Sequence, residues 1–337
     1  FFFQAQDGIR APLWSRGLGD VYKRQGTGDT TFTGAIGGSA PVKALTITSD
    51  QLTAGAITLN GALTATLANA STISGVIANG GGGTASLVKA GNGTLTLSAS
   101  NTYTGTTTIN AGDLTVSGSL HDDTAVSIAS NADYNVNASD TVASIEGAGD
   151  IVLASGQTLT AGDGNNKTLS GVMSGAGNYI KAGGGTQTLS ASNTYTGTTQ
   201  VSAGTLTVSG SGRLSDSTAV TVDGGATYNV AVSDTVASIA GAGSITLGSN
   251  TLTSGGSDAS TTFSGVMSGT NGNIVKAGSG TLTLTGNNSY TGSTTISAGL
   301  LKILRDNPTA YLAATSGFTG PGNLTIESAG CLLYTSD

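Results

Sequence analysis

The sequence predicts an all-β protein wound as an elongated parallel β-helix, with essentially no α-helix between residues 26 and 330. Three observations predict this fold class. Apolar residues alternate with polar ones in short runs, ordered blocks of sequence recur about every 94 residues, and 54 of the 337 residues are glycine.

The recurring blocks define long repeats. The pentapeptide N-T-Y-T-G occupies residues 101–105 and 193–197, and N-S-Y-T-G occupies 288–292. Self-similarity at such an interval is the signature of a repeat architecture, in which each unit packs on its neighbours. We therefore expect one continuous body over residues 26–330, in which a degenerate early unit precedes supra-repeats at about 71–166, 167–260 and 261–304.

Inside each repeat the apolar residues alternate with a period of two. Examples are Thr94–Leu97, Leu114–Val116 and Ala125–Ile128, and each run ends at Gly, Asn, Asp or Ser. This pattern is typical of short, half-buried strands joined by turns. Sustained helical spacing of apolar residues is missing, and threonine and glycine are poor helix formers.

A tandem array of immunoglobulin-like β-sandwich modules is the alternative architecture, since such modules have about 100 residues. The repeats contain no tryptophan and few aromatic residues, although an isolated sandwich usually fills its centre with large side chains. Residues 42–307 contain no proline, and glycine and asparagine are frequent, as tight corners with positive φ require. These features favour the β-helix.

The two ends differ abruptly in composition from the repeats. Residues 1–25 hold four of the 12 basic residues and the single tryptophan, and residues 331–337 hold the single cysteine. Both ends resemble translated adapter DNA. We therefore expect a non-native or capping head at 1–25, a non-native tail at 331–337, and a chain that is a fragment. The head lacks the apolar segment of a signal peptide.

Residues 89–116 read K-A-G-N-G-T-L-T-L-S-A-S-N-T-Y-T-G-T-T-T-I-N-A-G-D-L-T-V, and similar segments begin at Lys181 and Lys276. This pattern resembles the autotransporter-associated β-strand repeat, although the second segment departs from it at Gln187. The resemblance implies a secreted passenger domain of a Gram-negative type V system, built as a right-handed β-helix. It also implies an extracellular, cell-surface location and a C-terminal outer-membrane β-barrel in the complete protein, which this chain lacks. The lack of cysteine in 26–330 suits export of an unfolded chain.

The composition argues against several function classes. Charged residues make up 9% of the chain and the net charge is −7, whereas a nucleic-acid site needs clustered lysine and arginine. Runs of about 18 apolar residues are missing, so we expect no direct membrane insertion of this fragment. His121 is the only histidine, which leaves no basis for a catalytic triad or for a zinc site of three or four His and Cys ligands. We expect no enzyme, no metal and no cofactor.

A polysaccharide-active β-helix enzyme is the remaining catalytic alternative. Glycosidases need two carboxylates about 5–10 Å apart. The candidates are the adjacent Asp122 and Asp123 and the neighbourhood of Glu146 and Asp150, and neither pair recurs in the second repeat. A partner carboxylate from a neighbouring coil stays open at this point.

Two residue types mark each repeat. The tyrosines either pack over a turn with a hydrogen-bonded hydroxyl or offer a stacking face to glycans. They are Tyr103, Tyr195 and Tyr290. The lysines are either solvated residues or an anion site, and they are Lys89, Lys181 and Lys276.

These observations predict a non-catalytic passenger region that serves as a surface stalk, as a display element and as a self-templating export repeat. Adhesion is the second hypothesis, with glycans of a host cell, a partner cell or the matrix as the partners. The sequence names no ligand.

Overall fold

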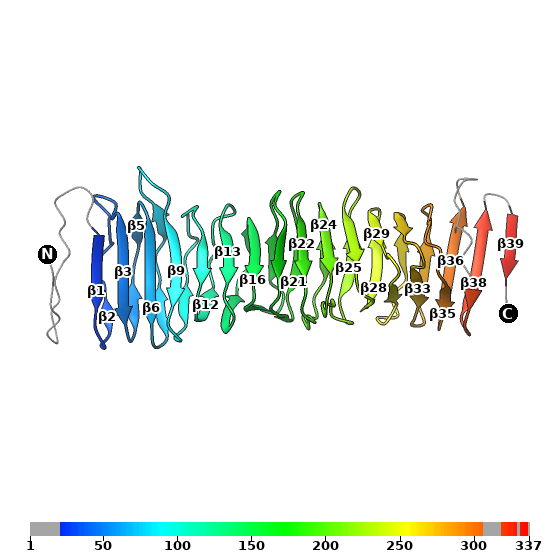
Figure 1. The fold of residues 1–337 in the computed structure, drawn as a ribbon, viewed down its shortest axis with the longest axis horizontal. Coiled ribbons are helices and arrows are strands. Elements are labelled where there is room, and N and C mark those ends of the chain that lie inside the picture. Colours follow the sequence, from blue (N-terminus) through cyan, green and yellow to red (C-terminus); the bar gives the residue numbers. More distant parts are fainter. Residues whose placement is uncertain (1–20, 306–317, 329–330, 336–337) are drawn as a thin grey trace. The chain divides into compact units, whose positions relative to one another are not determined.

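The computed structural model describes residues 21–305, 318–328 and 331–335. The chain divides into two compact units, Phe1–Thr160 and Ala161–Asp337. Within the described residues every regular element is a β-strand (Figure 1), which confirms the predicted all-β class.

The first unit is a stack of coils in which successive coils add strands to the same sheets. Figure 1 shows β1, β3, β6 and β9 side by side in that order. One sheet contains β1 (Val21–Gln25), β3 (Ala44–Ser49), β6 (Ala62–Leu67), β9 (Ser86–Ala90), β11 (Thr107–Ile109), β13 (Ala125–Ile128) and β16 (Ser144–Gly147). A second contains β2 (Thr30–Thr31), β4 (Leu52–Ala54), β7 (Ser71–Ile73), β10 (Leu95–Leu97), β12 (Gly112–Val116), β14 (Ala132–Val136) and β17 (Asp150–Leu153). The remaining strands are β5 (Ile57–Leu59), which pairs with β8 (Ile77–Asn79), β15 (Asp140–Val142), and β18 (Thr158–Ala161) at the boundary.

The second unit repeats this construction. One sheet contains β19 (Lys167–Leu169), β22 (Thr186–Leu189), β24 (Thr205–Val208), β26 (Thr227–Val230), β29 (Ser244–Thr246) and β32 (Val266–Ser268). Another contains β21 (Asn178–Lys181), β23 (Thr199–Val201), β25 (Ala219–Val222), β28 (Ser238–Gly241), β31 (Thr261–Phe263), β34 (Thr281–Leu284), β36 (Leu300–Arg305), β38 (Asn323–Ser328) and β39 (Cys331–Thr335). The third contains β27 (Asp234–Val236), β30 (Thr251–Ser254), β33 (Asn273–Lys276), β35 (Thr294–Ile296) and β37 (Phe318–Thr319), and β20 (Met173–Gly175) also belongs to this unit.

Strands of neighbouring coils pair in parallel. Leu45 lies opposite Leu63 in the first unit, and Thr186 lies opposite Thr205 in the second. The antiparallel pair of β38 and β39 is the exception among the described pairings. An immunoglobulin-like sandwich consists of antiparallel sheets, so the parallel pairing confirms the β-solenoid and overturns the tandem-sandwich alternative. The right-handed winding and the limits of the supra-repeats stay predictions.

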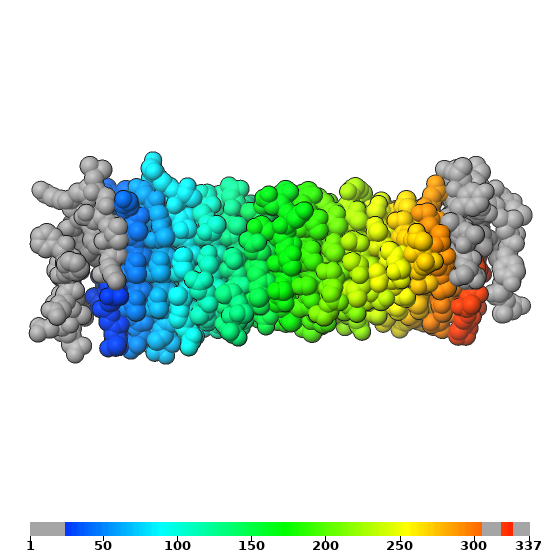
Figure 2. All heavy atoms as spheres, in the orientation of Figure 1, coloured from blue at the N-terminus to red at the C-terminus, as the bar shows by residue number. Residues whose placement is uncertain are grey.

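The core of each unit consists of columns of inward-facing side chains. In the first unit Leu95, Leu114, Tyr134 and Ile151 follow one another at the same register position in four successive strands. All four side chains are buried. Because each coil packs on the next, the columns together form the hydrophobic core that a single coil could not supply. Figure 2 shows the face in view as closely packed, with the loop after β8 projecting from the first unit.

Glycine is required where the chain turns out of a strand next to another coil. Gly91 has φ +74°, and a Cβ atom added to it would lie 2.3 Å from the backbone oxygen of Leu67. Gly183 has φ +66° at the equivalent corner, with the oxygen of Asp163 at 2.4 Å from such a Cβ. A larger residue would be strained by its own backbone and would push the coils apart.

The expectation of non-native ends falls partly outside the described residues, which do not include 1–20 and 336–337. Residues 21–25 form β1, which pairs with β3, and residues 331–335 form β39. The origin of the two ends stays a prediction.

Candidate functional site

Each repeat holds one lysine inside the coil. Lys89 lies in β9 two residues after Leu87, and because side chains alternate along a strand, both point inward. The Lys89 side chain is 0% exposed, and its Nζ donates to the backbone oxygens of Ala90 (3.1 Å), Gly91 (2.7 Å) and Ala111 (2.9 Å). An ammonium group has three N–H donors, so these acceptors satisfy it completely. The oxygen of Ala111 lies one coil further on, so the lysine ties two coils together.

The same arrangement recurs twice in the second unit. The acceptors are the backbone oxygens of Ala182, Gly183 and Ala203 for Lys181, and of Ala277, Gly278 and Ala298 for Lys276. Burial lowers the pKa of Lys89 to about 8, against the attraction of Asp113, and it also lowers the pKa of Lys181 and Lys276. The structure corrects the expectation of a solvated lysine or an anion site, because each ammonium is buried and bonded to backbone.

A buried asparagine connects three successive coils. Asn101 accepts from the backbone N–H of Ile77, 24 residues earlier, and its Nδ2 donates to the oxygens of Ala99 and of Ser119, 18 residues later. Asn193 makes the same three bonds one repeat further on. All hydrogen-bonding groups of these amides except one lone pair are thereby used inside the fold.

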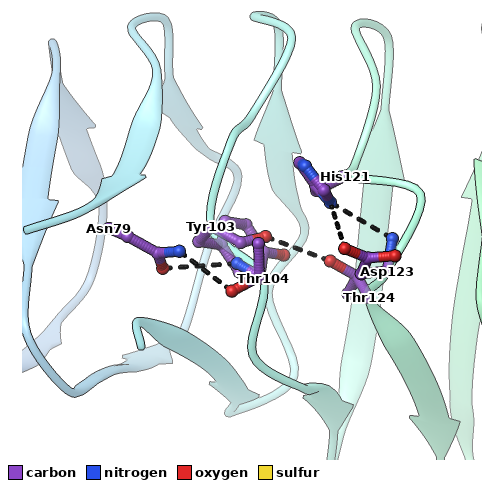
Figure 3. Close-up of polar contacts among 6 residues, drawn as sticks. All are labelled: Asn79, Tyr103, Thr104, His121, Asp123 and Thr124. Carbon is purple, nitrogen blue, oxygen red and sulfur yellow. Dashed lines mark hydrogen bonds and ion pairs between the residues drawn. The ribbon is translucent and has the colours of Figure 1, made fainter. Parts of the chain in front are cut away.

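The tyrosine two residues later is also buried. The Tyr103 hydroxyl lies 2.5 Å from Thr107 Oγ1. The backbone oxygen of Tyr103 accepts from Thr124 Oγ1 of the next coil (Figure 3). The equivalent hydroxyls of Tyr195 and Tyr290 bond to Thr199 and Thr294. All three tyrosines are 0% exposed, so their rings offer no stacking face to a glycan. The glycan hypothesis for these residues is corrected accordingly.

Tyr179 differs from these tyrosines, because its buried hydroxyl has no hydrogen-bond partner among the residues that the structure describes. Its inward position corresponds to Leu87 in the first repeat. We expect Tyr179→Phe to raise the free energy of unfolding by about 1–2 kcal/mol, since it removes a buried polar group without opening a cavity. The matched control is Tyr195→Phe, which removes a bonded hydroxyl and is expected to lose about 1 kcal/mol. Urea unfolding of both variants measures the difference, and equal losses would contradict the prediction.

Two buried aspartates escaped the sequence analysis. Asp140 is 4% exposed and accepts from Tyr134 Oη (2.6 Å) and from the backbone N–H of Leu120 (3.0 Å). Asp234 occupies the equivalent place in the second unit and is bonded to Tyr228 Oη and to Leu214 N–H. Burial raises the pKa of both carboxyl groups to about 6. The recurring segment D-T-V-A-S-I at 140–145 and 234–239 was the signal that could have identified them.

The residues considered for catalysis lie on different parts of the first unit. His121 lies in the loop after β12, where its Nδ1 accepts from the backbone N–H of Asp123 and lies 3.7 Å from the carboxylate of that residue (Figure 3). Glu146 belongs to β16 and Asp150 to β17, which are strands of two different sheets. Across the described ranges, the structure contains no group of three or more His, Cys, Asp and Glu side chains that could hold a metal ion.

Similarity to known proteins lies in the repeats. A family model described as "Passenger-associated-transport-repeat" matches residues 87–116, 180–208 and 274–303, which contain the buried lysines, asparagines and tyrosines. The chain is also 36% identical over 245 residues to the "Adhesin BmaC autotransporter" of Brucella suis biovar 1 (strain 1330). The three segments are similar to passenger-associated transport repeats, and both comparisons support an autotransporter passenger domain with β-strand repeats. Solved structures gave no match.

The match to the Brucella adhesin covers 64% of this chain but only 7% of the length of that adhesin. The three matched segments begin one or two residues before the buried lysine and end in β12, β24 and β36. The resemblance to passenger repeats is therefore confirmed, and so is a β-helix as their fold. Within the described residues, no helix is long and apolar enough to cross a membrane.

Proposed function

We propose that this chain is a non-catalytic stalk and display region of an adhesive autotransporter. The observation that carries the proposal is that the repeated polar side chains form their hydrogen bonds inside the fold. The lysine, asparagine and tyrosine of each repeat bind backbone or side chains of their own and neighbouring coils. Such side chains stabilise the stack of coils, and the loops between strands are left as the exposed, variable part. The name of the Brucella relative supports adhesion as the task of those loops.

Surface display is part of the same proposal. The passenger repeats support a location outside the cell, with anchoring by an outer-membrane β-barrel in the same polypeptide. Loops on a rigid scaffold are the usual place for binding residues. We propose that the partners are glycans of a host cell, a partner cell or the matrix, and that the loops rather than the buried tyrosines contact them.

The test is display of the full chain between a secretion signal and an outer-membrane barrel in a Gram-negative host without adhesins of its own. We expect an antibody to reach the chain on intact cells, and we expect these cells to adhere several-fold better to glycan-bearing surfaces than cells with the barrel alone. Display without added adhesion to epithelial, bacterial or matrix surfaces would contradict the adhesive role. Release of sugar from polysaccharides by the purified chain would contradict the non-catalytic role.

A further inference from the structure

The loop after β12 in the first unit (residues 117–124) and the loop after β24 in the second (residues 209–218) lie at equivalent places but differ in length and charge. Each loop lies beside an N-T-Y-T corner with the same buried hydrogen bonds. Leu120 follows Asn101 by 19 positions in the first unit, whereas Leu214 follows Asn193 by 21 positions in the second. The two additional residues put Arg213 at the bridge to Ser192, where the first unit has Ser119 at the bridge to Ser100. A constant scaffold therefore presents two different surfaces.

The loop of the second unit and its corner form a shallow, open pocket. The pocket is lined mainly by polar residues, among them Ser192, Thr194, Thr196, Arg213, Ser215 and Asp216. Ser192, Thr194 and Thr196 are exposed because they alternate along the chain with the buried Asn193 and Tyr195. Side chains of this kind, fixed at one corner, offer hydrogen-bond donors and acceptors to the hydroxyl groups of a sugar.

The guanidinium group of Arg213 is available in this pocket. Its Nη1 donates to the backbone oxygen of Gly212 at 2.8 Å, and no described carboxylate lies within 4.0 Å of it. The nearby Asp234 is buried and already accepts from Tyr228 Oη and from two backbone N–H groups, so it does not need the arginine. A guanidinium has five N–H donors in a planar fork that matches a carboxylate or a sulfate.

We propose that the corner around Arg213 binds an anionic sugar residue, one that carries a carboxylate or a sulfate, with the hydroxyls of Ser192, Thr194 and Thr196 contacting the sugar ring. This inference deepens the proposed adhesive function and rests on it. The equivalent loop of the first unit has the exposed Asp122 and Asp123 and lacks the arginine, whereas the second has Arg213 and one exposed aspartate, Asp216. The first loop is therefore the more negative of the two and disfavours the same ligand. Of the two described loops, that of the second unit therefore has the arginine corner.

The binding test uses the purified full chain and three sets of oligosaccharides of equal length. The sets are galacturonate oligomers, which carry carboxylates, sulfated dextran oligomers, and neutral dextran oligomers. We expect binding of the carboxylated or the sulfated set, or of both, weakened by added salt because the contact is ionic. The neutral set is expected not to bind. The set that binds more tightly identifies the anionic group.

The decisive variant is Arg213→Ser, which installs the side chain that the first unit has at its bridge. We expect at least a tenfold loss of affinity with an unchanged circular dichroism spectrum. Lys43→Ser is the control, because it removes an exposed positive charge of the other unit and is expected to leave affinity unchanged. Equal affinity of Arg213→Ser and the wild type, or equal binding of neutral and anionic sugars, would overturn the proposal.

The displayed chain separates failure of the site from failure of the proposed function. Loss of cell adhesion in Arg213→Ser supports both. Adhesion that persists in Arg213→Ser, together with lost oligosaccharide binding, supports the site but overturns its role in adhesion. Oligosaccharide binding that depends on Arg213, in a chain that confers no adhesion, overturns the adhesive function and leaves the sugar site standing.

Discussion

A Lys89→Met variant is expected to lose about 3–5 kcal/mol of the free energy of unfolding. Methionine can occupy the same buried volume, but it has no N–H group for the oxygens of Ala90, Gly91 and Ala111. A buried acceptor left without its donor costs about 1–3 kcal/mol, and three are left here. Because the oxygen of Ala111 lies on the next coil, the variant also weakens the contact between coils. Urea unfolding at pH 7, followed by far-UV circular dichroism, measures the loss.

The control for this prediction is Lys43→Met in the same unit. Lys43 is exposed, and its substitution is expected to change the free energy of unfolding by less than about 0.5 kcal/mol. The two variants change the net charge equally, so a difference between them comes from the buried hydrogen bonds. A Lys89→Met midpoint within the error of the Lys43→Met midpoint would show that the ammonium is not needed at this corner.

The fold could be predicted because the strands are local features of the sequence. Alternation within Thr94–Leu97 predicts an outward Thr96 between inward Leu95 and Leu97, and the structure has this arrangement in β10. The intervals between coils are irregular, because loops of different length join the strands. The parallel register nevertheless places Thr186 opposite Thr205 and Thr188 opposite Thr207. The sequence therefore predicts the coil architecture better than it predicts which residues meet across coils.

The burial of the lysines was not predicted, although the sequence contained a signal for it. Lys89 follows Leu87 by two residues, and Lys276 follows Ile274 by two, so each lysine has the inward parity of its strand. Exposed lysines were nevertheless expected from the sequence, because a lysine is seldom fully buried without a partner. The partners are backbone oxygens that become available only when the chain turns at Gly91 and at the next coil. Every residue has a backbone oxygen, so the sequence does not indicate which of them will accept from the lysine.

Acidification from pH 7.5 to pH 4.5 is expected to stabilise the chain, by about 2 kcal/mol for each of the two buried aspartates. Burial raises the pKa of Asp140 and of Asp234 from 3.8 to about 6 in the folded chain, whereas in the unfolded chain both return to ordinary values. The folded state therefore binds protons more tightly between pH 6 and pH 4. The stabilisation is fully present below the unfolded pKa and is lost as the pH rises through 6.

Neighbouring charges act unequally on the two aspartates. The charge of Asp122 raises the pKa of Asp140, whereas Arg213 lowers that of Asp234, although burial is the largest influence on both. The hydrogen bonds from Tyr134 and Tyr228 favour the charged carboxylates and so limit the rise. Because the pKa of both carboxyl groups is raised to about 6, we expect Asp140→Asn and Asp234→Asn to remove similar parts of the slope.

Urea unfolding at several pH values between 4.5 and 7.5 tests this prediction. An Asp140→Asn and Asp234→Asn double variant is expected to lose most of the pH dependence, because the amide does not titrate and still accepts the N–H of Leu120 or Leu214. The control double variant is Asp29→Asn with Asp216→Asn, which replaces one exposed aspartate in each unit and is expected to keep the full slope. Should stability fall steadily as the pH drops from 7.5 to 5, or should both double variants show the wild-type slope, the protons would be bound elsewhere, and these carboxyl groups would titrate near their ordinary pKa in the folded chain.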